Sequence, residues 1–408
     1  MREDACGRRV KGSLMFAGLT ALPPDSLLGV TARFRADPRP DKIDLGVGVF
    51  RDRQGRTPVM RAVAEAQARL VATETTKVYL PPESAPGFAD AIRALIFGAG
   101  FDDSRVAVVQ TPGGSGALRV AAELLKRASA QAIVVPAPTW ANHEPLLGAS
   151  GLAIRSIPYY DARTGGVDFA AFYAGAEKLG PRDALLIHAG CHNPSGADLS
   201  REEIDAIIDL AAAKKFLPFV DCAYHGFAEG LEADSYIARA MARRLPEFLI
   251  AYSCSKNFGL YRERTGAVVM IGADETAARA MTTHAVNAGR QMYSMPPAHG
   301  ALLVAEVLGD RALEQDWRME LETMRLAIKR SRTMLVEAAR AHQLCGRLDH
   351  LLNQNGMFSL LPIDEAQVAA LRERHALHLV NSGRINLCAV NEDNAGRIAE
   401  ALSDVMRG

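Results

Sequence analysis

Short apolar segments alternate with amphipathic segments through the middle of this 408-residue chain. Residues 105–110 (RVAVVQ) form an apolar run, a glycine-rich turn follows, and residues 117–128 (ALRVAAELLKRA) carry apolar side chains at helical spacing. Further apolar runs follow at residues 132–138, 184–190, 216–224, 248–255 and 266–272. Continuous apolar strands separated by amphipathic helices predict an α/β fold, in which helices cover both faces of a mostly parallel sheet.

Two segments of the sequence have the clearest helical signals. Residues 200–215 (SREEIDAIIDLAAAKK) begin with Ser200, and Glu203 follows three positions later, which predicts a capping box. A long charged helical segment runs from about Leu313 to about Arg340, and a shorter mixed segment follows it. Because the chain is longer than a single hydrophobic core usually supports, we expect a large domain and a smaller one.

The charge balance and the cysteines limit the class of protein. Lys plus Arg and Asp plus Glu both number 47, so no overall field attracts nucleic acid or an acidic membrane. Six scattered cysteines indicate no disulfide framework, and we expect a cytoplasmic location. No apolar run approaches the roughly 20 residues of a membrane helix. Residues 1–14 mix acidic and basic side chains and precede a second methionine at Met15, which favours a disordered extension or an upstream start over a targeting segment.

Polar residues follow the ends of three predicted strands: Asn193, then Asp221 with Tyr224, then Lys256. The carboxyl ends of parallel strands meet at one edge of a sheet, so we expect these side chains to form a site. Burial and nearby positive charge lower the pKa of a lysine, and a neutral amine attacks carbonyl groups. A lysine that extends from a sheet edge to solvent is the alternative for Lys256, and a helix cap is the alternative for Asp221.

The glycine turn at residues 113–118 (GGSGAL) is a candidate anion site. It lacks the lysine and the spacing of a Walker loop. It is also a poor dinucleotide motif, because Arg119 stands where a third glycine is needed after Gly114 and Gly116. Backbone N–H groups and the Ser115 hydroxyl at a helix N-terminus suit a phosphate, although a simple tight turn remains the alternative.

The loop at residues 188–196 contains possible metal ligands in His188, Cys191 and His192. No second ligand cluster accompanies them, so the sequence favours no metal site. A hydrogen-bonding role for Asn193, in a turn that Pro194 fixes, is the better interpretation.

Nine ordered motifs resemble those of fold-type I pyridoxal-phosphate aminotransferases, and more narrowly the aspartate and aromatic-amino-acid subgroup. The resemblance extends from about Met15 to the end of the chain. The motifs are GVGVF (46–50), TTKVYL (75–80), TPGGSGALRV (111–120), PTWANH (138–143), CHNPSG (191–196), DCAYHGFAEG (221–230), SCSKNFGLYRERTG (253–266), GRQMYSMPPAHG (289–300), and NQNGMFS with NSGRIN (353–359 and 381–386).

The resemblance implies how the chain is organised. A large domain at residues 58–317 holds a mostly parallel seven-stranded sheet and binds pyridoxal phosphate. A smaller α+β domain combines residues 15–57 and 318–408. The resemblance also implies a homodimer in which each subunit contributes residues to the active site of the other.

The resemblance assigns roles around the cofactor ring. Lys256 holds pyridoxal phosphate as a Schiff base, and Asp221 keeps the pyridine nitrogen protonated so that the ring accepts electrons. His143 orients Asp221, with His188 in the same neighbourhood. Trp140 stacks on the face of the ring.

Further residues hold the substituents of the cofactor. Tyr224 and Asn193 donate hydrogen bonds to the phenolic oxygen, and Tyr79 reaches the phosphate from the partner subunit. The other implied phosphate ligands are glycine, hydroxyl and arginine donors, namely Gly114, Ser115, Ser253, Ser255 and Arg264.

Two arginines bind the substrate in the family pattern. Arg384 pairs with the α-carboxylate, beside Trp140 and Asn193. Gly48 has no side chain, so the backbone can come close to the substrate there. Arg290 of the partner subunit meets the side-chain carboxylate of aspartate or glutamate. The implied reaction is a ping-pong transamination between an L-amino acid and a 2-oxo acid.

Five positions bear on the amino acid that is used. Val49 and Thr57 are typical of aspartate enzymes, whereas Val78, Ser115 and Met295 favour the aromatic enzymes. Val78 and Met295 stand where aspartate enzymes usually carry asparagine, and the loss of two amide side chains makes the pocket wall more apolar. We therefore predict a broad enzyme for Phe, Tyr, Trp, Asp and Glu with 2-oxoglutarate as acceptor. A strict aspartate aminotransferase is the alternative.

Two rival classes share parts of this pattern. A pyridoxal-phosphate decarboxylase or β-lyase would use the same lysine and aspartate, but the pair of arginines argues against it. A transcription regulator built on this fold would need an N-terminal helix-turn-helix domain, which the residues before Met15 are too few to form.

Overall fold

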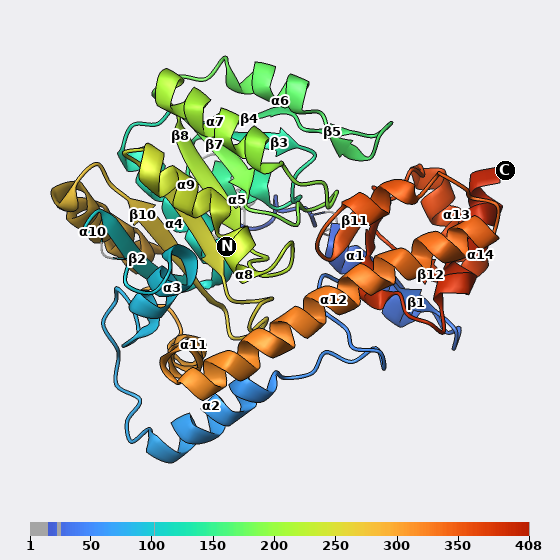
Figure 1. The fold of residues 1–408 in the computed structure, drawn as a ribbon, viewed down its shortest axis with the longest axis horizontal. Helices are drawn as coiled ribbons and strands as arrows, with labels where there is room; N and C mark the ends of the chain where they lie inside the picture. Colours follow the sequence, from blue (N-terminus) through green and yellow to red (C-terminus); the bar gives the residue numbers. More distant parts are fainter. Residues whose placement is uncertain (1–14, 23–25, 102, 408) are drawn as a thin grey trace, which may run out of the picture.

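A seven-stranded sheet forms the centre of the molecule in this computed structural model, which describes residues 15–22, 26–101 and 103–407 (Figure 1). All neighbouring strands are parallel except β10, which is antiparallel to β2 and to β9. The predicted mostly parallel sheet is therefore confirmed. In spatial order the strands are β2 (Val106–Pro112), β10 (Thr265–Ile271), β9 (Phe248–Ser253), β8 (Leu217–Cys222), β7 (Asp183–His188), β3 (Ala132–Ala137) and β4 (Ala153–Pro158).

Alternate residues of the strands face two different hydrophobic clusters. Leu186 and Val268 belong to the cluster that includes α4 and α10, whereas Leu185 and Val269 belong to the cluster that includes α3, α7 and α9. Both faces of the sheet are thus covered, which explains why the strands are apolar throughout. The helices concerned are α3 (Phe88–Phe97), α4 (Gly113–Arg127), α7 (Arg201–Lys214), α9 (Tyr236–Arg244) and α10 (Glu275–Met292).

Local signals set the beginnings of two of these helices. Ser200 Oγ accepts from Glu203 N, and Glu203 Oε2 accepts from Ser200 N, so the predicted capping box at α7 is confirmed. Helix α4 begins at Gly113 directly after β2. Gly113 has φ +71°, a conformation that favours glycine at this turn.

A long helix, α12 (Arg311–Ala341), confirms the predicted charged helical segment. Its N-terminal part packs with α2 (Arg61–Thr73) and α11 (His299–Gly309), and its C-terminal part packs with α14 (Ala395–Arg407) (Figure 1). The predicted domain boundary between residues 317 and 318 falls inside this helix, and the division into domains stays a prediction.

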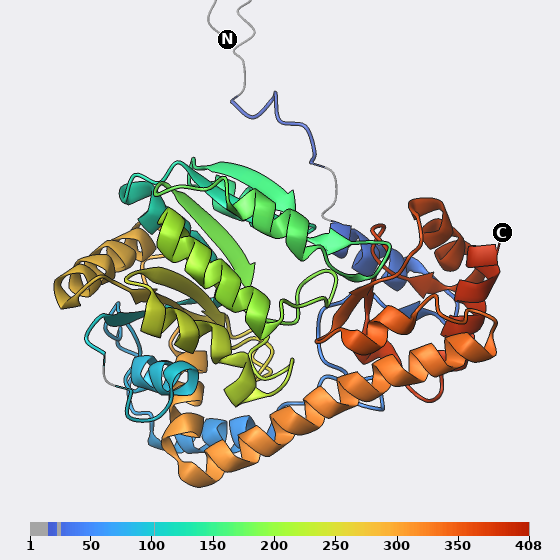
Figure 2. The same cartoon turned by 45° about the horizontal axis from the view of Figure 1, so that its top comes forward.

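Elements from both ends of the chain lie together at the C-terminal end of α12 (Figure 2). Strand β1 (Ile43–Asp44) pairs in parallel with β12 (Leu377–His378), and β11 (Phe358–Leu360) pairs antiparallel with β13 (Arg384–Asn386). The accompanying elements are α1 (Ser26–Ala36), η1 (Asp349–Asn353), α13 (Glu365–His375) and η2 (Leu387–Ala389). Shorter elements beside the large sheet are α5 (His143–Gly148), β5 (Tyr160–Asp161), β6 (Gly166–Val167), α6 (Phe169–Ala176) and α8 (Leu231–Asp234).

Two predictions concern the chain as a whole. The extension predicted for residues 1–14 lies outside the described residues. In the described ranges, no helix combines the length and the apolar character needed to cross a bilayer.

Candidate active site

A cavity of about 310 Å³ lies where the strands of the large sheet end and β11 and β13 approach them. Every predicted site residue except His143, Tyr79 and Arg290 lines this cavity. The predicted residues that line it are Gly48, Gly114, Ser115, Trp140, Asn193, Asp221, Tyr224, Ser253, Ser255, Lys256, Arg264 and Arg384.

The register of three parallel strands brings the central residues together. His188 on β7 lies opposite Asp221 on β8, and Asp221 lies opposite Ala251 on β9. The segments that follow these strands therefore leave the sheet at the same edge. This brings Asn193, Asp221 and Lys256 together, as predicted, and the strand order β9-β8-β7 places Asn193 and Lys256 on either side of Asp221.

Asp221 is held by a chain of hydrogen bonds behind the cavity. His143 Nε2 donates to Asp221 Oδ2 at 3.1 Å, and Thr139 Oγ1 lies 2.8 Å from His143 Nδ1 and 3.1 Å from His188 Nε2. Burial raises the pKa of Asp221. The hydrogen bond from His143 and the nearby positive charges lower the pKa by more than burial raises it, so it ends below its usual value. Burial lowers the pKa of His188 to about 3. Asp221 is therefore ionised and fixed in orientation.

The same side chains could suggest a metal site. Ligand atoms of His143, His188 and Asp221 lie within 4.8 Å of one another. However, these atoms already take part in the hydrogen bonds that orient Asp221. His192, another candidate ligand, is buried with its Nδ1 2.7 Å from Ser195 Oγ. The prediction that the chain holds no metal stays a prediction.

Lys256 faces the cavity with a lowered pKa. Its Nζ lies 4.9 Å from the centre of the Tyr224 ring. Burial lowers the pKa of Lys256 from 10.5 to about 8; Asp221 opposes this change, and the charges of Arg264 and Arg384 add to it. A useful fraction of the amine is therefore neutral near neutral pH, as a nucleophile for a carbonyl group requires.

The start of α4 and the loop around Lys256 form a close-packed group of donors. A Cβ atom at Gly113 would lie 2.8 Å from Arg264 Nη2, and one at Gly114 would lie 3.0 Å from Ser253 Cβ. Ser253 Oγ accepts from Ser255 N at 3.2 Å, which leaves its own hydrogen available. Helix N–H groups, hydroxyls and a guanidinium around one space fit a phosphate dianion.

Arg384 occupies the other end of the cavity, on β13. Its Nη1 donates to Asn193 Oδ1 at 3.1 Å and its Nη2 donates to Gly46 O at 2.8 Å. Its Nε is buried and has no hydrogen-bond partner among the described residues. Its guanidinium carbon lies 4.1 Å from the centre of the Phe358 ring, and a Cβ at Gly48 would lie 2.9 Å from Phe358 Cζ. The close approach expected at Gly48 is thus an approach to Phe358.

Some functional residues were not predicted. Leu118, Ala223 and Phe358 line the cavity, and Thr139 connects the two histidines. The motif that contains Phe358 was recognised, but an apolar residue in a short strand is more typical of a core. Only the pairing of β11 with β13 reveals that Phe358 supports Arg384.

Besides His143, which lies behind Asp221, two predicted residues lie outside the cavity. Tyr79 is 86% exposed. Arg290 is exposed on α10, and its Nη1 donates to Ser294 Oγ at 3.0 Å. Both were assigned to the active site of a partner subunit, which a single chain does not contain, so these two roles stay predictions.

Comparison with known proteins identifies the family. The model of the family "Aminotransferase class I and II" matches residues 40–402. The chain belongs to the class I and II aminotransferases. This aminotransferase is 41% identical over 394 residues to the aromatic-amino-acid aminotransferase of Pseudomonas aeruginosa, with 96% of this chain and 98% of the relative covered. It is 42% identical over 397 residues to the aspartate aminotransferase of Salmonella typhi, with 96% and 100% covered.

A solved structure extends the comparison to the fold. The aromatic-amino-acid aminotransferase from Burkholderia pseudomallei, described as covalently bound to pyridoxal phosphate, matches this aminotransferase with a TM-score of 0.93 at 34% identity. The match covers 96% of this chain and 99% of that one. The predicted family, fold class and enzyme type are confirmed.

Proposed function

We propose that this aminotransferase binds pyridoxal phosphate in the cavity and transfers amino groups between 2-oxoglutarate and both aromatic and dicarboxylic L-amino acids. One observation carries the proposal. A lysine with a pKa of about 8, an ionised aspartate and a set of anion donors all face the same space of about 310 Å³. These three features match the aldehyde, the ring nitrogen and the phosphate of that cofactor.

Pyridoxal phosphate supplies, when bound, an aldehyde for the amino group and a ring that accepts electrons from the substrate Cα. Asp221 holds a proton on the ring nitrogen, because its carboxylate is ionised and His143 orients it. Lys256 Nζ moves the proton to and from the substrate Cα, for which its lowered pKa suits it.

Asn193 has a divided role in this proposal. Its side-chain oxygen accepts from Arg384, so its amide NH₂ group is available to donate to the phenolic oxygen of the cofactor. Tyr224 lines the same space and is the second donor to that oxygen. Asn193 thereby connects the arginine that binds substrate to the ring.

Arg384 binds the α-carboxylate of the substrate. Its unpartnered Nε supports this role, because a buried guanidinium N–H without an acceptor is costly. Arg290 and Tyr79 complete the site from a second subunit, so the proposal includes a homodimer. The exposure of Tyr79 (86%) and of the neighbouring Val78 (68%) supports an interface at this segment.

The proposed specificity depends on three positions that the family resemblance assigns to the substrate pocket. Ser115 lines the cavity of this chain, whereas Val78 and Met295 lie outside its lining. Val78 and Met295 are apolar where aspartate enzymes usually carry asparagine, which favours aromatic side chains. Arg290 must move aside for an aromatic ring, since a buried unpaired arginine is costly. A strict aspartate aminotransferase remains the alternative.

The test compares kcat/KM for aspartate and phenylalanine with 2-oxoglutarate as acceptor. We expect both to be substrates, with values within about a hundredfold of each other. An aspartate advantage above about a thousandfold, about 4 kcal/mol, would contradict the dual specificity.

A half-reaction screen tests the chemistry itself. The holoenzyme is mixed with each amino acid and the cofactor absorbance is followed without an acceptor. We expect stoichiometric conversion and release of a 2-oxo acid. Release of CO₂ or ammonia would instead indicate a decarboxylase or a lyase. The cytoplasmic location stays a prediction.

A further inference from the structure

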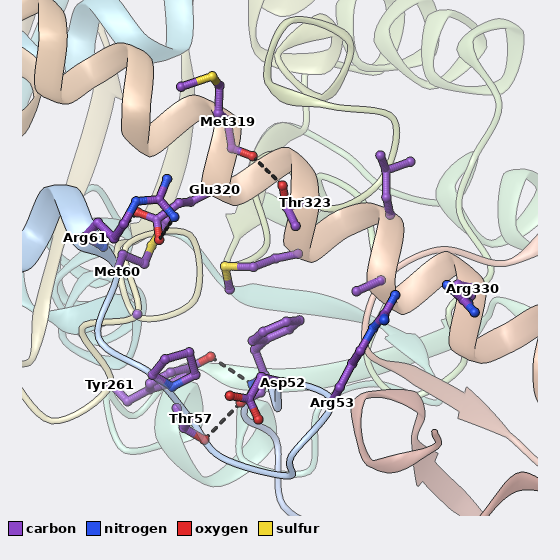
Figure 3. Close-up of a pocket in the computed structure, with 16 residues that line it drawn as sticks. Asp52, Arg53, Thr57, Met60, Arg61, Tyr261, Met319, Glu320, Thr323 and Arg330 are labelled. Atoms are coloured by element: carbon purple, nitrogen blue, oxygen red, sulfur yellow. Dashed lines mark hydrogen bonds and ion pairs between the residues drawn. The ribbon is translucent and has the colours of Figure 1, made fainter. Parts of the chain in front are cut away.

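A second cavity, of about 570 Å³, lies beside the segment that follows Gly48 and shares no lining residue with the first (Figure 3). Its walls are residues 50–61, the loop with Tyr261, and the stretch of α12 from Met319 to Arg330. A smaller cavity of about 130 Å³ continues it along α12. We call the two together the α12 groove.

The floor and the rim of the α12 groove are mostly apolar. Phe50 and Met60 are buried at its floor. On the α12 side, Met319 is 55% exposed and Leu326 is 50% exposed, although both are large apolar side chains. Exposed apolar side chains around a concave surface are typical of a binding site rather than of ordinary surface.

One cation of the α12 groove has no partner. Arg53 forms no ion pair or hydrogen bond with the described residues, and its side chain extends from the loop toward α12 (Figure 3). Most of the other charged lining residues are paired: Asp52 with Arg56, Arg61 with Asp316 and Glu320, Arg330 with Glu392, and Arg51 with Asp44. Asp393 lines only the smaller cavity and forms no ion pair with the described residues. The groove thus offers one free positive charge beside an apolar surface.

We propose that the α12 groove binds a small amphipathic monocarboxylate, such as an aryl-substituted or branched-chain acid. The hydrocarbon part lies against Phe50, Met60 and the α12 side chains, and the carboxylate pairs with Arg53, which presents a fork of donors. A second carboxylate on the ligand is disfavoured, because Asp52 and Glu320 also line the groove. This charge pattern separates its ligand from the dicarboxylates of the catalytic cavity.

The α12 groove and the catalytic cavity share one segment of chain. Tyr261 Oη accepts from Phe50 N at 3.0 Å, and Thr57 Oγ1 donates to Phe50 O at 2.9 Å. Two residues earlier, Gly48 lines the catalytic cavity, and Gly46 O accepts from Arg384. A ligand that packs on Phe50 therefore restrains the segment that supports the substrate arginine. We expect occupancy of the groove and binding of the substrate carboxylate to change each other's affinity by the same factor.

The binding test uses 3-phenylpropionate as probe and the full-length holoenzyme. Saturating maleate, an unreactive dicarboxylate, first occupies the catalytic cavity, and calorimetry then measures probe binding. We expect one probe per chain. Arg53→Ala should weaken binding about tenfold, because a charge-assisted pair is lost. Ala327→Glu places a negative charge in the groove and should abolish binding.

Lys329→Ala is the matched control. Lys329 is an exposed cation on the same stretch of α12, but it lines neither cavity and pairs with no lining residue, so probe binding should be unchanged. Absence of binding in the presence of maleate would overturn the proposal. Equal binding by the parent, Arg53→Ala and Ala327→Glu would also overturn it. Calorimetry needs no turnover, so this outcome is separate from any failure of transamination.

The coupling has its own test. The KM for the amino donor is measured with and without saturating probe, in the parent and in Ala327→Glu. We expect a change of about twofold or more that Ala327→Glu removes, whereas competition at the catalytic cavity would persist in that variant. An equal response of the two proteins would overturn the coupling.

Discussion

The two ends of the catalytic cavity differ in how much of the site a single chain supplies. At the cofactor end, Lys256, Asp221 and Ser253 all come from strands of the large sheet or from the loops that follow them. At the substrate end, Arg384 is in place, but Arg290 and Tyr79 point to solvent on the same chain.

This difference separates chemistry from specificity. The cofactor end depends on the register of neighbouring parallel strands, which a folded subunit fixes by itself. In the proposed homodimer, the substrate end depends also on how a second subunit approaches. We therefore expect changes at the cofactor end to abolish every reaction, and changes at the substrate end to act on some substrates only.

The largest effect should follow Lys256→Ala. Loss of the amine removes both the covalent attachment and the proton carrier, so kcat should fall about 10⁴-fold for aspartate and for phenylalanine alike. Steady-state assays with both donors measure this. Lys178→Ala, at an exposed lysine in the turn that follows α6, is the control and should keep full activity. A loss restricted to one donor would break the distinction between the two ends.

Arg290→Ala should lower kcat/KM about 10²- to 10³-fold for aspartate and less than about threefold for phenylalanine, because only aspartate loses an ion pair. The variant also tests where Arg290 acts. When Arg290→Ala and Lys256→Ala proteins are mixed and allowed to exchange subunits, one site of each hybrid regains both residues.

Aspartate activity should then rise well above that of either variant. If Arg290 acted within its own subunit, the mixture would show no gain. The phenylalanine activity of the mixture serves as the reference, since Arg290→Ala alone already supports it.

Arg384→Lys should raise the KM of both donors about tenfold to a hundredfold, because a lysine cannot reproduce the planar pair of donors that a carboxylate accepts. Bound cofactor, followed by its absorbance, should be retained. Arg262→Lys, at an exposed arginine near the site, is the matched control. Loss of cofactor from Arg384→Lys would show that the two ends are not independent.

The smallest effect concerns pH. Uptake of pyridoxal phosphate by the cofactor-free protein should become about tenfold faster from pH 7 to pH 9, since the neutral fraction of Lys256 rises through its pKa of about 8. The free energy of unfolding should also rise with pH between about 8 and 10.5, because in that window the unfolded chain binds more protons than the folded one. Stopped-flow absorbance measures the rate of uptake, and denaturant titrations measure the free energy of unfolding. A midpoint of uptake near 10.5 would contradict the lowered pKa.

The strands and the helix signals were predictable because they are local. Ser200 with Glu203 formed the expected capping box, and the long helix began and ended close to the expected residues. The antiparallel direction of β10 was not evident from its sequence, because a strand buried on both faces is apolar in either direction.

The site shows the same division between local and long-range information. The positions of Asn193, Asp221 and Lys256 followed from their place after apolar strands. The contact of Phe358 with Arg384, and the link from His143 through Thr139 to His188, depend on residues far apart in sequence. No periodicity or spacing encodes such contacts.

The sequence by itself determined the alternating strands and helices, the family through its ordered motifs, and the residue types that bind a phosphate and a carbonyl group. Only the tertiary structure decided the electrostatics. The pKa of Lys256 falls to about 8 because folding buries it near two arginines, and Asp221 stays ionised because folding brings His143 to 3.1 Å from it. Desolvation and Coulomb interactions depend on distance in space, which the order of residues along a chain does not specify.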